Sequence, residues 1–156
     1  MNSDTLYSIR PAHTYDCELF HELRNDPNYR RYFQQQKDIP FEEHNLWFYK
    51  KLESDDARYF TIITFNGVAV GYIRFDKMDR GDWSISVAIK PNLRWRGIMS
   101  RMILAALQNM PECTIIARVH RDNTASIRLF ESVRFAPTGT EGEFMVFMRK
   151  SREREK

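Results

Sequence analysis

Residues 84–100 constrain the fold more than any other segment, because they combine a strand pattern, a basic turn and a helix pattern. Residues 84–89 alternate small and apolar side chains with a period of two, and Pro91 ends that pattern. Apolar residues then recur with a helical period. We therefore expect a helix to begin near Gly97.

The start of this expected helix is suited to bind an anion. Backbone N–H groups in a first helical turn lack intrahelical partners, and the helix dipole places partial positive charge there. Arg94 and Arg96 bring two guanidinium groups to the same corner, and Gly97 lets the backbone approach a ligand closely. A pyrophosphate fits this chemistry, and the alternative is a surface turn with solvated arginines.

A second segment that reads as a strand followed by a helix covers residues 115–135. At this point the chain resembles the GNAT superfamily of acetyl-CoA-dependent N-acetyltransferases. The first family signature is Gln/Arg-x-x-Gly-x-Gly/Ala, and the second is a strand followed by Asn-x-x-Ser/Ala-x-x-Leu-Tyr-x-x-x-Gly-Phe. The matching positions here are Arg94, Gly97, Asn123, Ser126, Leu129 and Phe130.

Four positions depart from these signatures. Trp95 stands where the family often has Gly, and Arg134 replaces the Gly before Phe135. Met99 replaces the final Gly/Ala, so its side chain must point away from the pyrophosphate. Phe130 removes the phenol that is thought to protonate the departing CoA sulfur in many relatives. A thiol pKa of roughly 8.5 makes that loss tolerable, because the thiolate leaves readily.

The resemblance covers nearly the whole chain and implies an α/β fold. In this fold a mixed, mostly antiparallel sheet of about seven strands is flanked by about four helices. Residues 1–150 are expected to form a single domain, followed by a polar tail at residues 151–156. The strand patterns lie at residues 7–12, 59–65, 68–75, 83–89, 114–119, 135–137 and 143–149, and the helix patterns at residues 14–24, 42–54, 97–109 and 123–133.

The resemblance further implies acetyl-CoA as co-substrate and no metal. The pantetheine arm is expected between splayed strands at residues 84–89 and 114–119, bonded to backbone groups of Val87 and Ile89. An acceptor amine would attack the thioester directly, while a strand N–H polarises the carbonyl oxygen. The expected cofactor-binding residues are Val87, Ile89, Arg94, Trp95, Arg96, Gly97, Ile98, Met99, Ser100, Asn123, Ser126 and Phe130.

The amine must lose a proton, and three residues are candidates for the general base. Ser84 and Ser86 lie on the splayed strand and could hold a water, or they are simply polar residues on a half-exposed strand. His44 offers an imidazole, which is a competent base near neutral pH, or it is a surface residue at a helix start.

The acceptor site is expected in the first half of the chain, at Asn25, His44, Trp47 and Arg74. These motifs resemble the branch of the family that acetylates nucleotide-linked amino sugars in pathways of the pseudaminic or legionaminic acid type. They also share features with the branch that acetylates N-termini of ribosomal proteins. A non-catalytic acyl-CoA-binding protein is the third hypothesis, and core packing is the alternative role of Trp47.

Composition is compatible with this function. The net charge of +3 comes from interspersed charges and does not by itself favour nucleic acid. Two cysteines are too few for a disulfide framework, and no apolar run could form a signal sequence or span a bilayer. We expect a cytoplasmic enzyme with a small-molecule amine acceptor and no nucleic-acid or membrane partner, and a homodimer remains open.

Overall fold

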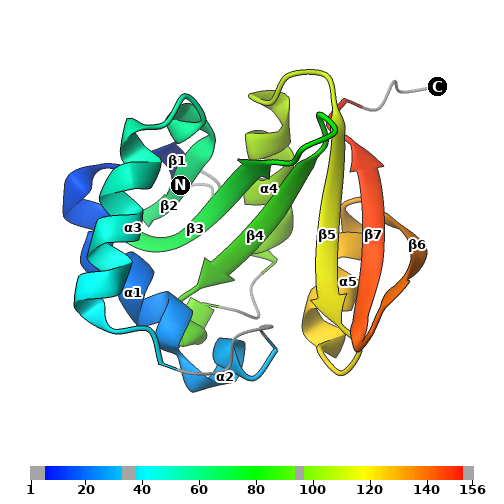
Figure 1. Ribbon diagram of the computed structural model, residues 1–156, viewed down its shortest axis with the longest axis horizontal. Helices are drawn as coiled ribbons and strands as arrows, with labels where there is room; N and C mark the ends of the chain where they lie inside the picture. The colour runs from blue at the N-terminus through cyan, green and yellow to red at the C-terminus, as the bar shows by residue number, and fades with distance from the viewer. Residues whose placement is uncertain (1–5, 33–37, 94–96, 153–156) are drawn as a thin grey trace.

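The computed structural model describes residues 6–32, 38–93 and 97–152 (Figure 1). The helices in these ranges are α1 (Cys17–Asn25), α2 (Pro27–Arg30), α3 (Phe41–Glu53), α4 (Ile98–Gln108) and α5 (Thr124–Ser132). The strands are β1 (Tyr7–Pro11), β2 (Phe60–Phe65), β3 (Val68–Lys77), β4 (Trp83–Ile89), β5 (Thr114–His120), β6 (Ala136–Glu141) and β7 (Phe144–Lys150).

The strands form one mixed sheet in the order β1-β2-β3-β4-β5-β7-β6. All neighbouring strands are antiparallel except β4 and β5, which are parallel and pair only at Trp83 with Ile115 and at Ser84 with Ile116. Beyond these pairs β4 and β5 diverge, as Figure 1 shows. The predicted mixed sheet and its splayed strands are confirmed.

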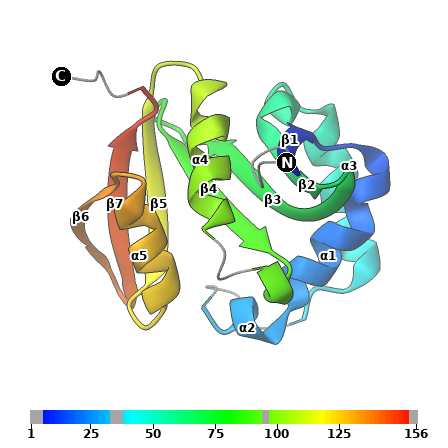
Figure 2. The same cartoon turned by 180° about the vertical axis from the view of Figure 1, so that it is seen from behind.

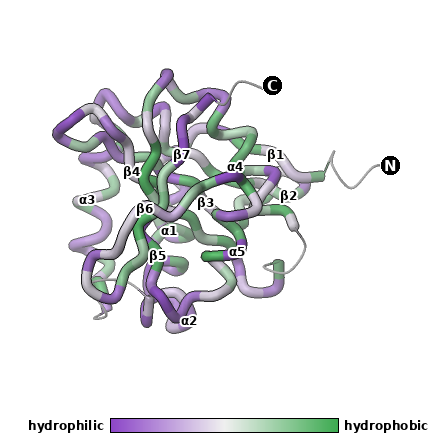
Figure 3. Tube along the Cα trace, turned by 90° about the vertical axis from the view of Figure 1, so that its right-hand side faces the viewer, coloured by the Kyte–Doolittle hydropathy of each residue, from purple (hydrophilic) through white to green (hydrophobic). Residues whose placement is uncertain are grey.

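Helices cover both faces of the sheet. The apolar side chains of α4 and α5 pack with those of β4, β5 and β7 in the larger core, on the face seen in Figure 2. Helices α1 and α3 pack over β2 and β3 in a smaller, aromatic core on the opposite face. In Figure 3 hydrophilic residues gather on α3 and the loops, whereas β4 and β5 are largely hydrophobic. No helix in the described ranges combines the length and the apolarity that a bilayer crossing requires.

Two glycines explain how β3 is placed. Asn66 and Gly67 both have positive φ, at 50° and 80°, so they form a tight turn between β2 and β3. Gly71 lies opposite Ile89, and a Cβ at Gly71 would lie 2.6 Å from the carbonyl oxygen of Ala88. Only glycine lets β3 and β4 approach so closely at this point.

The structure adds one helix to the expected set and extends one strand. Helix α2 begins where the Asp26 carboxylate accepts a hydrogen bond from the N–H of Asn28 at 2.9 Å, with Pro27 at its first position. Strand β6 is longer than the expected residues 135–137. All six of its residues are exposed, so no alternation of apolar side chains marks it.

Candidate active site

The open edge of β4 faces the gap left by β5. The N–H of Lys90 bonds the carbonyl oxygen of Val70 at 2.9 Å, and the bonding direction alternates along an antiparallel ladder, so Val87 and Ile89 turn their N–H and C=O groups away from β3. Both polar groups of the Ile89 backbone bond the Tyr29 hydroxyl, at 2.9 and 3.0 Å. The predicted strand-like ligand contact at Val87 therefore has the right orientation, whereas Ile89 is already engaged by Tyr29.

A cavity of about 780 Å³ opens between this edge, the first turn of α4 and the length of α5. We call it the α4–α5 cavity. Gly97 lines it as the N-cap of α4 with φ +68°, so the helix begins as predicted. A Cβ at Gly97 would meet no described protein atom within 4 Å, which leaves room for a ligand at the helix start. Expected cofactor residues that line this cavity are Val87, Ile89, Gly97, Met99, Ser100, Asn123 and Ser126.

The remaining expected cofactor residues have different positions. Met99 is 8% exposed and belongs to the larger core, which explains how a large side chain fits at a small-residue position of the signature. Ile98 is buried in the same core and lines neither cavity. Arg94, Trp95 and Arg96 lie outside the described residues.

Asn123 has a structural contribution of its own, because its side-chain oxygen accepts a hydrogen bond from the N–H of Ser126 at 3.3 Å and caps α5. Phe130 packs against Phe135 with ring centroids 5.1 Å apart and lines the neighbouring cavity described next.

That second cavity, of about 450 Å³, lies between α1 and β5 on the α1/α3 face of the sheet, and we call it the α1–β5 cavity. It shares Tyr29, Tyr32, Val87, Asn123 and Ser126 with the α4–α5 cavity, so the two spaces meet in the β4–β5 gap. Its polar lining includes the predicted residues Arg74, Ser84 and Ser86 and the residues Arg24, Arg118 and His120, which sequence reasoning did not place in the site.

Three guanidinium groups face the α1–β5 cavity, and they differ in their partners. Arg74 pairs with Asp76 at 2.7 Å, and Arg118 pairs with Glu141 at 2.7 Å. Arg24 has no carboxylate at ion-pair distance within the described ranges. Burial, and then the nearby charge of Arg74, lower the pKa of Arg24. Its guanidinium is therefore the cation here whose charge is least compensated.

Trp47 connects two of these cations. The Arg24 Cζ lies 4.5 Å from the centre of its ring and the Arg74 Cζ lies 5.0 Å from it. Trp47 is partly buried beside the aromatic core and lines neither cavity. Trp47 therefore contacts the two arginines, and its predicted contact with the acceptor stays a prediction.

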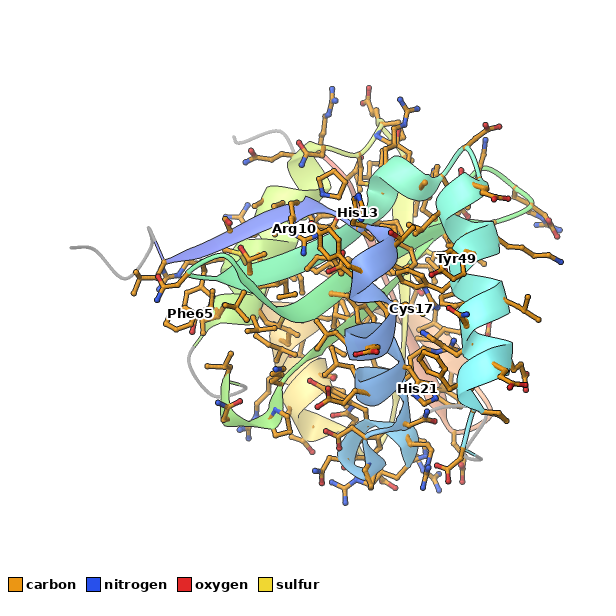
Figure 4. The ribbon with its side chains drawn as sticks, turned by 90° about the vertical axis from the view of Figure 1, so that its left-hand side faces the viewer. Arg10, His13, Cys17, His21, Tyr49 and Phe65 are labelled. Carbon is orange, nitrogen blue, oxygen red and sulfur yellow. The ribbon has the colours of Figure 1, made fainter. Side chains whose placement is uncertain are left out.

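His44 lies in the core between α1 and α3, with no exposed surface. The alternative of a surface imidazole is wrong, because the inward face of α3 carries His44 and Phe48 together. This burial does not support the predicted direct contact between His44 and the acceptor. Figure 4 shows Cys17 and His21 projecting from α1 towards α3, into the interface where His44 lies. Burial, followed by the charge of Arg24, lowers the His44 pKa to about 4.

Asn25 also has a structural role. Its side-chain oxygen accepts a hydrogen bond from the N–H of Ile39 at 2.9 Å, and its amide group donates to the Ile39 carbonyl at 3.1 Å. The chain following the gap in the described residues is thereby tied to the end of α1. Asn25 lines neither cavity.

The two serines do reach the α1–β5 cavity. Ser86 Oγ lies 3.5 Å from Arg74 Nη2, and Ser84 Oγ lies 3.5 Å from the Asp76 carbonyl oxygen. These contacts are long, so both hydroxyls can still bond a water in the cavity.

His120 accepts a hydrogen bond at Nδ1 from the N–H of Asp122 at 3.1 Å, which places its proton on Nε2, towards Glu143.

Both the sequence and the fold resemble those of known proteins. The chain is 29% identical over 132 residues to Acetyltransferase PseH of Campylobacter jejuni subsp. jejuni serotype O:23/36 (strain 81-176), covering 83% of each chain. The fold resembles yncA, a putative acetyltransferase from Salmonella typhimurium with its cofactor acetyl-CoA, with a TM-score of 0.74, 21% identity and 96% of both chains covered. It also resembles spermidine N-acetyltransferase from Vibrio cholerae in complex with CoA and spermine, with a TM-score of 0.76, 17% identity and coverage of 94% and 96%.

The family is decided by the sequence match rather than by these structural likenesses. Residues 8–136 match the family described as Acetyltransferase (GNAT) domain, which is most of the 156-residue chain. The chain belongs to the GNAT family of acetyl-CoA-dependent N-acetyltransferases.

Proposed function

We propose that this enzyme acetylates the primary amine of a nucleotide-linked amino sugar. The observation that carries the proposal is the group of three guanidiniums in the α1–β5 cavity, with Arg24 free of a carboxylate partner among the described residues. Such a cavity favours an acceptor that carries phosphate, because guanidinium groups bond phosphate oxygens in pairs. Resemblance to the relative PseH supports the same class of acceptor.

The α4–α5 cavity has residues that fit acetyl-CoA, which supplies an activated acetyl thioester. The open N-terminus of α4 at Gly97 would receive the pyrophosphate, and the Val87 backbone would bond the pantetheine amide. Because both cavities meet at Val87, the thioester and the acceptor amine would come together in the β4–β5 gap.

The residues around the gap provide the remaining steps of a direct transfer. A backbone N–H on the β4 edge would polarise the thioester carbonyl, and a water held by Ser84 and Ser86 would take the amine proton. Phe130 has no proton to donate, so CoA would leave as the thiolate. Binding energy from the phosphate groups would hold the amine in line for attack.

The proposal is tested with a thiol-release assay on three acceptors: a nucleotide-linked amino sugar, the same sugar without its nucleotide, and a peptide with a free N-terminus. We expect the highest kcat/KM with the nucleotide-linked sugar. Higher kcat/KM with the peptide would favour the protein N-terminal acetyltransferase hypothesis, and binding of acetyl-CoA without turnover would favour the non-catalytic one.

Arg24→Gln provides the matching variant. Loss of a charge-assisted hydrogen bond of about 1.5–3 kcal/mol should raise the KM of the nucleotide-linked acceptor by tenfold to a hundredfold while leaving the KM of acetyl-CoA unchanged. Arg58→Gln removes the same charge at an exposed position outside both cavities and is the control. An equal effect of the two substitutions would show that only the net charge matters.

A further inference from the structure

His44 has a polar partner at each ring nitrogen, and together the two partners determine where its proton lies. Nε2 lies 3.2 Å from the backbone oxygen of Cys17, which can only accept a hydrogen bond. Nδ1 lies 3.3 Å from Nη1 of Arg24, and a guanidinium can only donate. The ring is therefore neutral, with the proton on Nε2 and a lone pair on Nδ1 directed at Arg24.

We propose that His44 is a positioning residue that holds the Arg24 guanidinium in the α1–β5 cavity by accepting its hydrogen bond. This inference rests on the proposed function, in which Arg24 bonds the phosphate groups of the acceptor. His44 itself lines neither cavity and has no exposed surface, so it can act only through Arg24.

The surroundings of Arg24 explain why its guanidinium needs a partner that holds it in the α1–β5 cavity. Arg24 and Arg74 both lie over the Trp47 ring, so the two cations repel each other across a shared aromatic surface. A flexible guanidinium would swing away from Arg74 and from the cavity. The contact with His44 holds one end of the guanidinium, and the Trp47 ring packs against it, with Arg24 Cζ 4.5 Å from the ring centre.

A neutral imidazole is also the partner that leaves the most charge for a ligand. The carboxylates of Asp76 and Glu141 partly cancel the charges of Arg74 and Arg118. His44 accepts a hydrogen bond from Arg24 without adding a negative charge. Burial of the ring and the adjacent Arg24 keep it neutral, since both lower its pKa. Arg24 is thus oriented while its full charge remains available.

The first experiment concerns the free wild-type protein and needs no ligand. Ring ¹⁵N chemical shifts and couplings of His44 should show a neutral ring with a protonated Nε2 and an unprotonated Nδ1. A proton on Nδ1 would overturn the proposal, because that nitrogen could not then accept from Arg24.

The second experiment is a double-mutant cycle that uses calorimetric binding of UDP as the probe. We expect His44→Phe to weaken UDP binding by about tenfold in the wild-type background and to have almost no effect in the Arg24→Gln background. An equal loss in both backgrounds would overturn the proposal, because His44 would then act through the general integrity of the core. His44→Asn retains an acceptor near the position of Nδ1 and should recover most of the affinity, whereas failure to do so would contradict the role of Nδ1.

The two proposals can fail separately. If the wild-type protein does not bind UDP, the effect of His44 on Arg24 is measured instead as the hydrogen-exchange rate of the Arg24 side-chain N–H groups. Faster exchange in His44→Phe than in wild type would support the positioning role while the proposed acceptor class falls. Unchanged exchange would overturn the positioning role.

Discussion

Substitutions at Gly97 can distinguish an effect on the stability of the fold from an effect on the binding of CoA. Its φ of +68° is the left-handed conformation, in which an L-residue other than glycine costs roughly 1–2 kcal/mol. For a domain of this size each kcal/mol lowers the melting temperature by about 2–4 °C. Gly97→Ala should therefore lose a few degrees of stability without a steric clash, because no described atom lies within 4 Å of the new Cβ.

Gly81 provides a matched control for that strain. Its φ is +86°, a Cβ there would also meet no described atom within 4 Å, and it lines neither cavity. Gly81→Ala should thus lose about as much stability as Gly97→Ala. In calorimetry with CoA, however, only the substitution at Gly97 should weaken binding, because only Gly97 lines the cavity proposed to receive the pyrophosphate.

Gly97→Glu extends the same test with charge. A carboxylate about 4 Å from a phosphate charge is repelled by about 4 kcal/mol at an effective dielectric constant of 20, which corresponds to roughly a thousandfold loss of affinity. Folding is checked by circular dichroism. A folded Gly97→Glu variant that binds CoA with the wild-type Kd would refute the pyrophosphate assignment.

Four further predictions follow from particular contacts. Gly71→Ala should destabilise the fold by about 2 kcal/mol or more, because the new Cβ would force β3 and β4 apart at Ala88. Gly139→Ala, where a Cβ meets nothing within 4 Å, should change the melting temperature little. Tyr29→Phe frees the Ile89 backbone groups that the Tyr29 hydroxyl bonds, so acetyl-CoA should bind up to about tenfold more tightly in calorimetry. Weaker binding would show that the hydroxyl belongs to the cofactor site. Phe130→Tyr should change kcat only modestly, and a tenfold rise, equivalent to about 1.4 kcal/mol of barrier, would show that proton donation to CoA limits the wild-type enzyme. As pH falls from 6.5 towards about 4, the free energy of unfolding should decrease by up to about 3 kcal/mol, because His44 becomes protonated in the unfolded chain but stays neutral in the folded one. Denaturant titrations of His44→Phe should lack this contribution to the pH dependence.

Local sequence patterns predicted the parts of the fold whose cause is local. The period-two pattern at β4 and the helical period after Gly97 correctly located both elements and the cap between them. The turn at Asn66 and Gly67 also has a local cause, which is the preference of these residues for positive φ. Strand β6 was underestimated because it is exposed along its whole length and so has no alternation to read.

The surroundings of the α1–β5 cavity were harder to predict because their arrangement depends on contacts between distant segments. Tyr29 bonds the backbone of Ile89, which lies 60 residues away, and no sequence pattern around Tyr29 predicts that contact. His44 reads as a polar residue at a helix start, and only the packing of α3 on α1 makes it a buried acceptor for Arg24. Arg24 directly precedes Asn25, which was predicted to lie in the acceptor site, but no local pattern indicates that Arg24 lines the cavity.

The most direct test of the account follows the acetyl group itself. The enzyme is incubated with carbon-13-labelled acetyl-CoA and a nucleotide-linked amino sugar, and both the sugar and the protein are examined by mass spectrometry. Direct transfer between the two cavities predicts one labelled acetyl group on the sugar amine and none on the protein. Label that accumulates on the protein when acetyl-CoA is supplied alone and then passes to the sugar, or no label on the sugar although acetyl-CoA binds, would contradict it.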